Sequence, residues 1–121
     1  MKSTQEIQAL IDQACGTGYY YRFSIFRNAP VVTDGVIALA HAAECFWLLD
    51  LINSYQSNKR LDKDFQFWEL KVNPKDHSAV VHGCNDTHQR IITRRMNYTT
   101  FPLAYLKLYL CNGVIMLPGE Y

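Results

Sequence analysis

The fold is decided most clearly by one stretch near the end of the chain, Leu106-Lys107-Leu108-Tyr109-Leu110-Cys111-Asn112-Gly113-Val114-Ile115-Met116-Leu117. Its central dipeptide, Asn112-Gly113, is the one most typical of a type I′ hairpin turn, in which both central residues take positive φ. A two-residue turn also fixes the strand register, so we predict that Cys111 pairs with Val114 and Tyr109 with Met116. We therefore expect antiparallel strands over 106–111 and 114–117.

Both faces of this hairpin are apolar. Alternation along the strands groups five side chains on one face: Leu106, Leu108, Leu110, Ile115 and Leu117. The other face carries Tyr109, Cys111, Val114 and Met116. An antiparallel sheet packed on one side normally leaves its other face polar, so we expect something to cover this second face. The two candidates are a second copy of the chain and the first helix of the same chain.

Two helices precede the strands of the second half. The first begins with a capping box formed by Ser3 and Glu6, and a left-handed cap is expected at Gly16. The second has Thr33 as its N-cap and runs to about Tyr55. Its apolar side chains extend well beyond half of the helix circumference, which is typical of a helix buried on more than one side.

Four more segments have the aromatic and β-branched content of strands: 19–26, 65–72, 79–84 and 90–98. The last two are expected to form a hairpin around 85–88. The sequence contains no internal repeat or linker, so we interpret 1–121 as a single domain. We predict an α+β fold, an antiparallel sheet of about five to six strands with two main helices, the longer one packed across the sheet.

Composition narrows the function classes. The chain has 121 residues, of which 49% are hydrophobic and 13% aromatic, and its formal net charge is +1. That net charge produces no overall field to attract a nucleic acid or an anionic membrane, although a local basic patch remains compatible with it. The polar N-terminus lacks a secretory signal, and the longest apolar stretch, 35–52, is too polar for a membrane span. We predict a cytoplasmic protein whose four scattered cysteines are reduced rather than paired in two disulfides.

Several short motifs along nearly the whole chain carry a family resemblance: Gly16-Thr17, Tyr20-Tyr21-Arg22, Thr33-Asp34-Gly35-Val36, Phe46-Trp47-Leu48-Leu49-Asp50, Lys107-Leu108-Tyr109, Gly113-Val114 and Met116-Leu117-Pro118-Gly119-Glu120-Tyr121. On these the chain resembles a bacterial family of small uncharacterised domains found in cyanobacteria, plasmids and phage-like elements. Gly119 stands where the family ending usually has Ser. The resemblance implies an intact fold and an association with mobile elements, and it implies no activity.

A metal site is one alternative. His41 and Cys45 are one helical turn apart, and His82 and Cys84 share one face of a predicted strand. These are the ligand types of a Cys₂His₂ zinc site, but their spacing is not that of a zinc finger. We favour core cysteines and half-buried histidines, and we predict neither a metal nor a cofactor.

An enzyme is a second alternative, built on Asp50, His41 or Cys45. Asp50 is the most anomalous charge, because it lies beside Trp47 and Leu51 on an apolar helix. A buried carboxylate there would suit acid–base chemistry, although such groups more often serve as hydrogen-bond acceptors in the structure. The sequence contains no phosphate-binding loop, nucleophile elbow or zinc-protease motif, so we lean away from an enzyme.

A small-ligand or single-stranded nucleic-acid binding domain is a third alternative. Basic residues lie on one predicted strand and near the first one: Arg90, Arg94 and Arg95, with Arg22 and Arg27 beside Tyr19 and Tyr20. Aromatic and basic side chains on an open sheet face can bind single strands. Alternation nevertheless sends Arg94 and Arg95 to opposite faces, which divides the patch.

The surplus of apolar side chains favours association over these alternatives. We expect the outer flank of the second helix and the second face of the terminal hairpin to bury each other in a homo-oligomer, most simply a homodimer. The favoured function is a non-enzymatic module that binds a macromolecule, a protein in preference to a nucleic acid, such as a mobile-element modulator or inhibitor of a host system. The expected binding residues are Trp68, Tyr19, Tyr20, Tyr105, Arg95 and Arg94, because interfaces favour exposed aromatic and Arg side chains.

Overall fold

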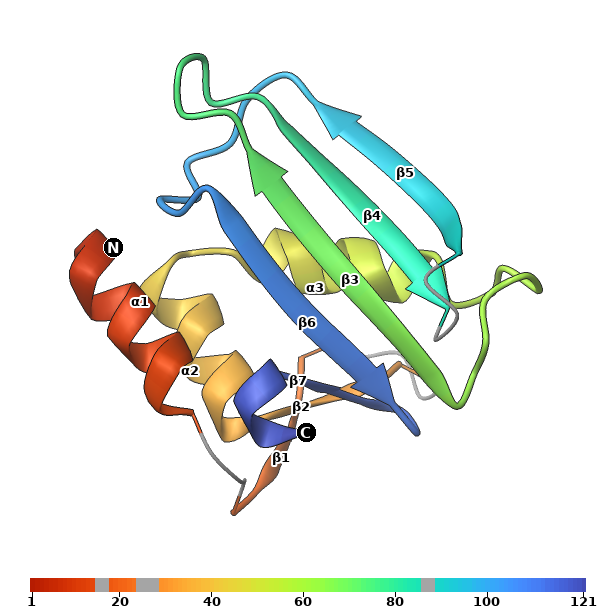
Figure 1. Cartoon of the computed structure of the whole chain (residues 1–121). Helices are drawn as coiled ribbons and strands as arrows, with labels where there is room; N and C mark the ends of the chain where they lie inside the picture. Colours follow the sequence, from red (N-terminus) through yellow and green to blue (C-terminus); the bar gives the residue numbers. More distant parts are fainter. Residues whose placement is uncertain (15–17, 24–28, 86–88) are drawn as a thin grey trace.

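The computed structural model describes residues 1–14, 18–23, 29–85 and 89–121. The elements of this part are α1 (Thr4–Gln13), β1 (Tyr20–Arg22), β2 (Val31–Thr33), α2 (Asp34–Ala42), α3 (Phe46–Ser54), β3 (Phe65–Val72), β4 (Ala79–Asn85), β5 (Arg90–Met96), β6 (Tyr105–Cys111), β7 (Val114–Met116) and the 3-10 helix η1 (Pro118–Glu120). The strands form one sheet in the order β1-β2-β7-β6-β3-β4-β5 (Figure 1). Neighbouring strands are antiparallel except β2 and β7, which are parallel. The predicted α+β class is therefore confirmed.

The terminal hairpin has the predicted register. Cys111 lies opposite Val114 and Tyr109 opposite Met116. Asn112 and Gly113 both take positive φ, 49° and 81°, as a type I′ turn requires. The aliphatic face of the hairpin is buried throughout, with Ile115 fully inaccessible to solvent.

The predicted second helix is in fact two helices, so the expectation of one helix to Tyr55 is wrong. Glu44 takes a left-handed conformation, with φ of 53°, between α2 and α3. The N–H of Cys45 donates to the carbonyl oxygen of Ala40 at 3.0 Å, which is the hydrogen bond of a Schellman motif. The position in the left-handed conformation is usually Gly, so a Glu there carries no sequence signal for a helix end. The break separates two short helices, each of which packs on the sheet.

The start of the chain partly follows the prediction. The capping box of α1 is present, with Glu6 N donating to the Ser3 hydroxyl at 3.2 Å. The helix ends at Gln13, and Ala14 after it is extended, whereas the expected cap at Gly16 lies outside the described residues. A strand was expected over 19–26. The structure describes this segment only to residue 23, and within it residues 20–22 form β1. The short strand β2 was not expected, because Pro30 and the helix N-cap at Thr33 leave it only three residues.

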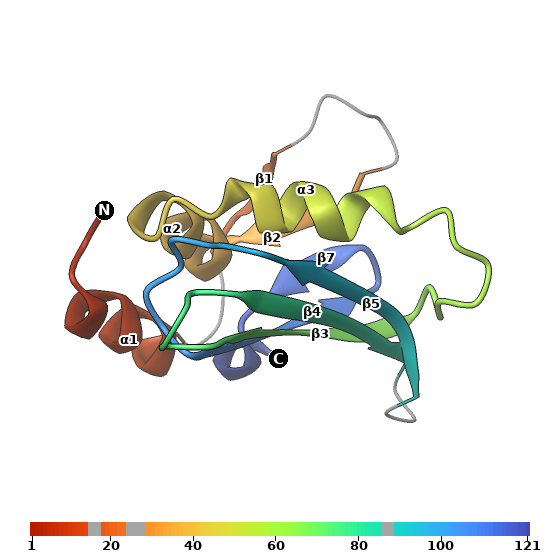
Figure 2. The same ribbon diagram turned by 90° about the horizontal axis from the view of Figure 1, so that it is seen from above.

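The helices divide the sheet into two unlike faces. α3 lies along one side of β3, β4 and β5, and α2 lies on the same side (Figure 2). We call this side the inner face; Trp68, Leu70 and Leu108 on it are each 2% exposed or less. Trp68 packs over Gly83, where an added Cβ would lie 2.6 Å from the indole ring. α1 packs beside α2 and η1 and does not extend over β3, β4 or β5 (Figure 1).

The C-terminal segment is fastened to the beginning of α2. One carboxylate oxygen of Glu120 accepts hydrogen bonds from the Thr33 hydroxyl at 2.6 Å and from Leu117 N at 3.0 Å. The other accepts from Gly35 N at 3.3 Å. A carboxylate is favourable there because the first turn of a helix leaves N–H groups unpaired. Among the described residues, no helix is long and apolar enough to cross a membrane.

Candidate functional site

The face of the sheet opposite α2 and α3, here called the outer face, has β3 at its centre. No helix of the described part lies across β3, β4 or β5 on this side (Figure 2). The strand register arranges its side chains in three rows: Phe67, Cys84 and Tyr109; Glu69, His82, Lys107 and Thr93; and Lys71, Val80, Tyr105 and Arg95. Strands separated by long stretches of chain therefore combine their side chains on one surface.

One end of the outer face is aromatic. The ring centroids of Phe65, Tyr109 and Tyr121 lie 5.2–5.5 Å from one another, which is within the range of favourable ring–ring contacts. The ammonium group of Lys107 lies 4.9 Å from the ring centroid of Phe67 and 5.2 Å from that of Tyr109. Both distances suit cation–π interactions. Tyr121 is 72% exposed, so this cluster is open to solvent.

The middle of the outer face is polar. The Tyr105 hydroxyl donates a short hydrogen bond to the Glu69 carboxylate, and the Thr93 hydroxyl lies 3.3 Å from Nδ1 of His82. Partial burial, together with the hydrogen bond to Glu69, raises the pKa of Tyr105 above its usual range. Burial, followed by the positive charges of Arg90 and Lys71, lowers the pKa of His82. The imidazole is therefore mainly neutral at pH 7, and the charges of Arg90 and Lys71 act in the same direction as its burial.

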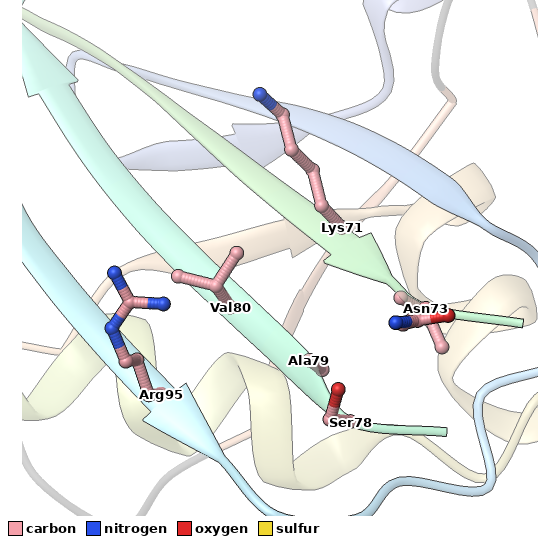
Figure 3. A pocket seen from close by; sticks show the side chains of 7 residues that line it. Lys71, Asn73, Ser78, Ala79, Val80 and Arg95 are labelled. Carbon is pink, nitrogen blue, oxygen red and sulfur yellow. The ribbon is translucent and has the colours of Figure 1, made fainter. Parts of the chain in front are cut away.

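The other end of the outer face is basic and hollowed. Lys71 on β3 and Arg95 on β5 flank Val80 on β4, and Ser78 and Asn73 close the hollow at one end (Figure 3). The volume of the hollow is about 310 Å³. Lys71 and Arg95 are exposed, and neither forms an ion pair within the described part of the chain. The hollow is thus lined by two cations that form no ion pair within the described residues.

Charge is segregated between the helices and the sheet. The strands contain six cationic residues, Arg22, Lys71, Arg90, Arg94, Arg95 and Lys107, and one acidic residue, Glu69. The three α-helices contain no Lys or Arg and four acidic residues, Glu6, Asp12, Asp34 and Asp50. The formal net charge of +1 therefore conceals a positive sheet beside negative helices. Local fields of this kind attract ligands of opposite charge even when the whole protein is nearly neutral.

The expected binding residues do not form one site. Trp68 was expected to be exposed, and this is wrong, because it lies in the core on the inner face and its indole N–H donates to Gln66 at 3.0 Å. Tyr105 and Arg95 do share the outer face, in the same row. Arg94 lies on the opposite side of β5, where its guanidinium is 3.4 Å from the Tyr55 hydroxyl.

Tyr19 and Tyr20 lie elsewhere. They are 72% and 61% exposed at the edge formed by β1, whereas Arg95 is on β5 at the other edge of the sheet. The division of Arg94 from Arg95 by strand alternation is confirmed by the register. Arg27, one of the basic residues considered with these tyrosines, lies outside the described residues.

The residues considered for metal binding are separated. His82 and Cys84 belong to β4 on the outer face, whereas Cys45 is buried between the helices and His41 is exposed on α2. Within the described residues, no group of three or more His, Cys, Asp or Glu side chains is placed to hold a metal ion. Cys45, Cys84 and Cys111 are free thiols, and Cys15 lies outside the described part.

The residues considered for catalysis differ in exposure, since Asp50 and His41 are exposed and Cys45 is buried. Asp50 is exposed on α3, so the expectation of a buried carboxylate is wrong; the helix packs through Leu48, Leu49 and Ile52 instead. Burial raises the pKa of Cys45 to about 12, which keeps its thiol protonated and weakly nucleophilic at neutral pH. The exposed His41 ring makes an edge contact with Phe46, at a centroid distance of 5.0 Å.

Several aromatic and cationic residues of the outer face were not among the expected binding residues: Phe65, Phe67, Lys71, Lys107, Tyr109 and Tyr121. Their signal is the period-two pattern of the predicted strands, which already separates Phe67 and Lys71 from Trp68. This pattern does not predict that β3 pairs with β6, although that pairing brings Phe67 opposite Tyr109, more than 40 residues later in the chain.

Comparison with known proteins gives a family and no function. The model of a family of unknown function (DUF6876) matches residues 5–121. No curated protein and no solved structure matches the chain.

Proposed function

This chain belongs to the DUF6876 family of unknown function, and we propose that it is a binding module for single-stranded nucleic acid. The proposal rests on one observation: the outer face presents aromatic rings on neighbouring strands together with cations that form no ion pair within the described part of the chain. Aromatic rings on a sheet stack on bases, and cations between them contact phosphates. Both parts of a single strand therefore have a counterpart on this face.

The aromatic part of the face supplies stacking surfaces. Tyr109 and Phe65 are partly exposed, and Tyr121 is largely exposed. Base–aromatic stacking contributes about 1–3 kcal/mol per base and depends little on base identity. Lys107 lies against the rings of Phe67 and Tyr109, where its charge is available to a phosphate between stacked bases.

The positive charge of the sheet favours a polyanion as the ligand of the outer face over the outer face of a second copy of the chain. Two outer faces packed against each other across a two-fold axis would bring Lys71, Lys107 and Arg95 of both copies into one interface, where like charges repel. The large exposed apolar residues of the described part are Met1 and six tyrosines, with no aliphatic patch among them. Tyrosines on a surface suit contacts that are partly polar.

The homo-oligomer stays a prediction, since a single chain does not test it. The predicted dimer also uses the second face of the terminal hairpin, which includes Tyr109 of the outer face, so it would compete with a nucleic acid for part of this surface. A cytoplasmic location, a place in mobile-element biology and a role as modulator or inhibitor of a host system are proposals that rest on the sequence alone. Binding of an acidic protein is the competing use of the same surface.

The proposal is tested by fluorescence anisotropy with a labelled oligothymidylate and with a duplex of equal length. We expect the single strand to bind more tightly than the duplex, and its affinity to fall as salt is raised from 50 to 200 mM. Tyr109→Ala and Lys107→Gln are expected to weaken binding at least several-fold. Tyr98→Ala and Lys59→Gln, which change exposed residues outside the strands, serve as matched controls.

Three results would contradict the proposal. The first is no binding at 50 mM salt by a folded protein. The second is equal affinity for duplex and single strand, which would remove the role of the rings. The third is an equal loss in the control variants, which would mean that only general charge matters.

A further inference from the structure

The hollow between Lys71 and Arg95 is different in kind from the rest of the outer face. The two cations are two strands apart, about 10 Å between backbones, and both project from the same row. Between them lies Val80, an uncharged side chain that leaves the floor of the hollow apolar (Figure 3). Two cations on the same side of the sheet that form no ion pair within the described residues can both contact one anion placed between them.

We propose that this hollow binds the terminal phosphate of a nucleic-acid strand, and the choice of ligand rests on the function proposed above. A terminal phosphate carries about −1.5 to −2 charges near pH 7, against −1 for an internal phosphodiester. A pair of cations therefore discriminates in favour of the terminus. Arg also offers a planar fork of donors for phosphate oxygens, and Lys adds a point charge.

The surroundings of the hollow favour an end over an internal position. Asp76 follows β3 in the turn beyond the hollow, and its carboxylate accepts hydrogen bonds from the N–H and hydroxyl of Ser78, at 2.9 and 2.7 Å. These bonds lower the pKa of Asp76, so the carboxylate is ionised. A strand that continued past the hollow would bring its next phosphate toward this negative charge.

The distance to the aromatic cluster suits a short strand. Phe65 and Lys71 are six residues apart on β3, which corresponds to about 20 Å along the strand. A single strand stacked on the rings at one end can therefore reach the hollow at the other with a few nucleotides. The outer face then has a direction, with bases at the aromatic end and the terminus at the basic end.

The test compares oligothymidylates of one length that carry a 5′-phosphate, a 3′-phosphate or hydroxyls at both ends. We expect one phosphorylated form to bind about tenfold more tightly than the hydroxyl form, as one added charge-assisted interaction provides. Arg95→Ala and Lys71→Ala should remove this preference while still binding the hydroxyl form. Arg94→Ala is the matched control, because it removes the same side chain from the other side of the same strand, and it should keep the preference.

The inference is overturned if all three oligonucleotides bind equally, or if Arg94→Ala removes the preference as fully as Arg95→Ala. If no oligonucleotide binds, the function proposed above fails. Titration with inorganic phosphate and thymidine monophosphate then tests separately whether the hollow binds phosphate. Amide NMR shifts at Lys71, Val80 and Arg95 that saturate and vanish in Arg95→Ala would then support a phosphate site for a free nucleotide. Absence of such shifts would overturn it as well.

Discussion

The inner and outer faces are two sides of the same strands, yet they are built for different environments. On β3, Trp68 and Leu70 point inward and are 2% exposed or less, whereas the neighbouring Glu69 and Lys71 point outward and meet solvent. The inner side chains gain free energy from burial, which amounts to about 25 cal/mol per Å² of apolar surface. On the outer face, Phe67 is only 5% exposed and also gains free energy from burial, whereas the exposed Tyr121 and Lys71 gain little, which fits the binding function proposed above.

The largest expected effect comes from deleting the central side chain of the inner face. Trp68→Ala removes a fully buried indole that packs on Gly83 and Tyr55, and we expect it to lower the free energy of unfolding by about 3–5 kcal/mol. Urea denaturation measures this. The matched change on the outer face, Tyr105→Ala, should cost about 1 kcal/mol or less, the value of an exposed hydrogen bond. Similar losses for both would mean that the outer face is also packed against something.

The next effect concerns the C-terminal segment. Glu120→Ala leaves the Thr33 hydroxyl and the N–H groups of Gly35 and Leu117 without their acceptor, so we expect a loss of about 1–3 kcal/mol. Thermal and urea denaturation measure it. Asp50→Ala on the exposed side of α3 is the control and should change stability by less than about 0.5 kcal/mol. If both variants melt alike, the fastening of η1 to α2 does not contribute to the fold.

A smaller effect, of opposite sign, is expected at the break that lets α3 lie along the inner face. Glu44 holds φ at 53°, a conformation that costs a residue with a Cβ about 1–2 kcal/mol relative to glycine. Glu44→Gly should therefore stabilise the protein, by about 0.5–1 kcal/mol after the greater entropy of unfolded glycine is included. Glu44→Ala keeps the strain and should not stabilise. A destabilised Glu44→Gly would show that the contact of Glu44 with the N-terminal amino group, at 3.6 Å, outweighs the strain.

These positions also mark what the sequence could predict. The turn at Asn112-Gly113 and the capping box at Ser3 were predictable because their signals are local and depend on backbone conformation. The break at Glu44 was not, because a residue without left-handed preference holds the position and the apolar pattern continues across it. The apolar pattern of the predicted second helix correctly indicated buried side chains, but it gave no sign of the break between α2 and α3.

The candidate site was predictable only in pieces. Period-two alternation separates the outer Phe67 and Lys71 from the inner Trp68, so the choice of Trp68 as a surface residue went against a pattern already visible. Alternation also placed Arg95 opposite in direction to Arg94. The proximity of Phe65, Tyr109 and Tyr121 depends on long-range strand pairing and on the path of the C-terminal segment, neither of which has a local signal.

The smallest expected effect is a pH dependence of the free energy of unfolding, caused by His82 on the outer face. His82 lies on the outer face, and its pKa in the folded protein is lowered by burial and by the charges of Arg90 and Lys71. Below about pH 6.5, the ordinary value, the unfolded chain takes up this proton more readily than the folded chain, so stability falls as the pH falls. Urea denaturation at pH 7.5 and pH 5.5 measures the change, and His82→Gln should reduce it while exposed His41→Gln should not.

A bound polyanion adds negative charge to the same face and should reverse part of the pKa shift of His82. An NMR titration of the His82 ring with and without oligothymidylate therefore connects the charge of this face to its ligand, and an unchanged pKa in the complex would place the strand elsewhere.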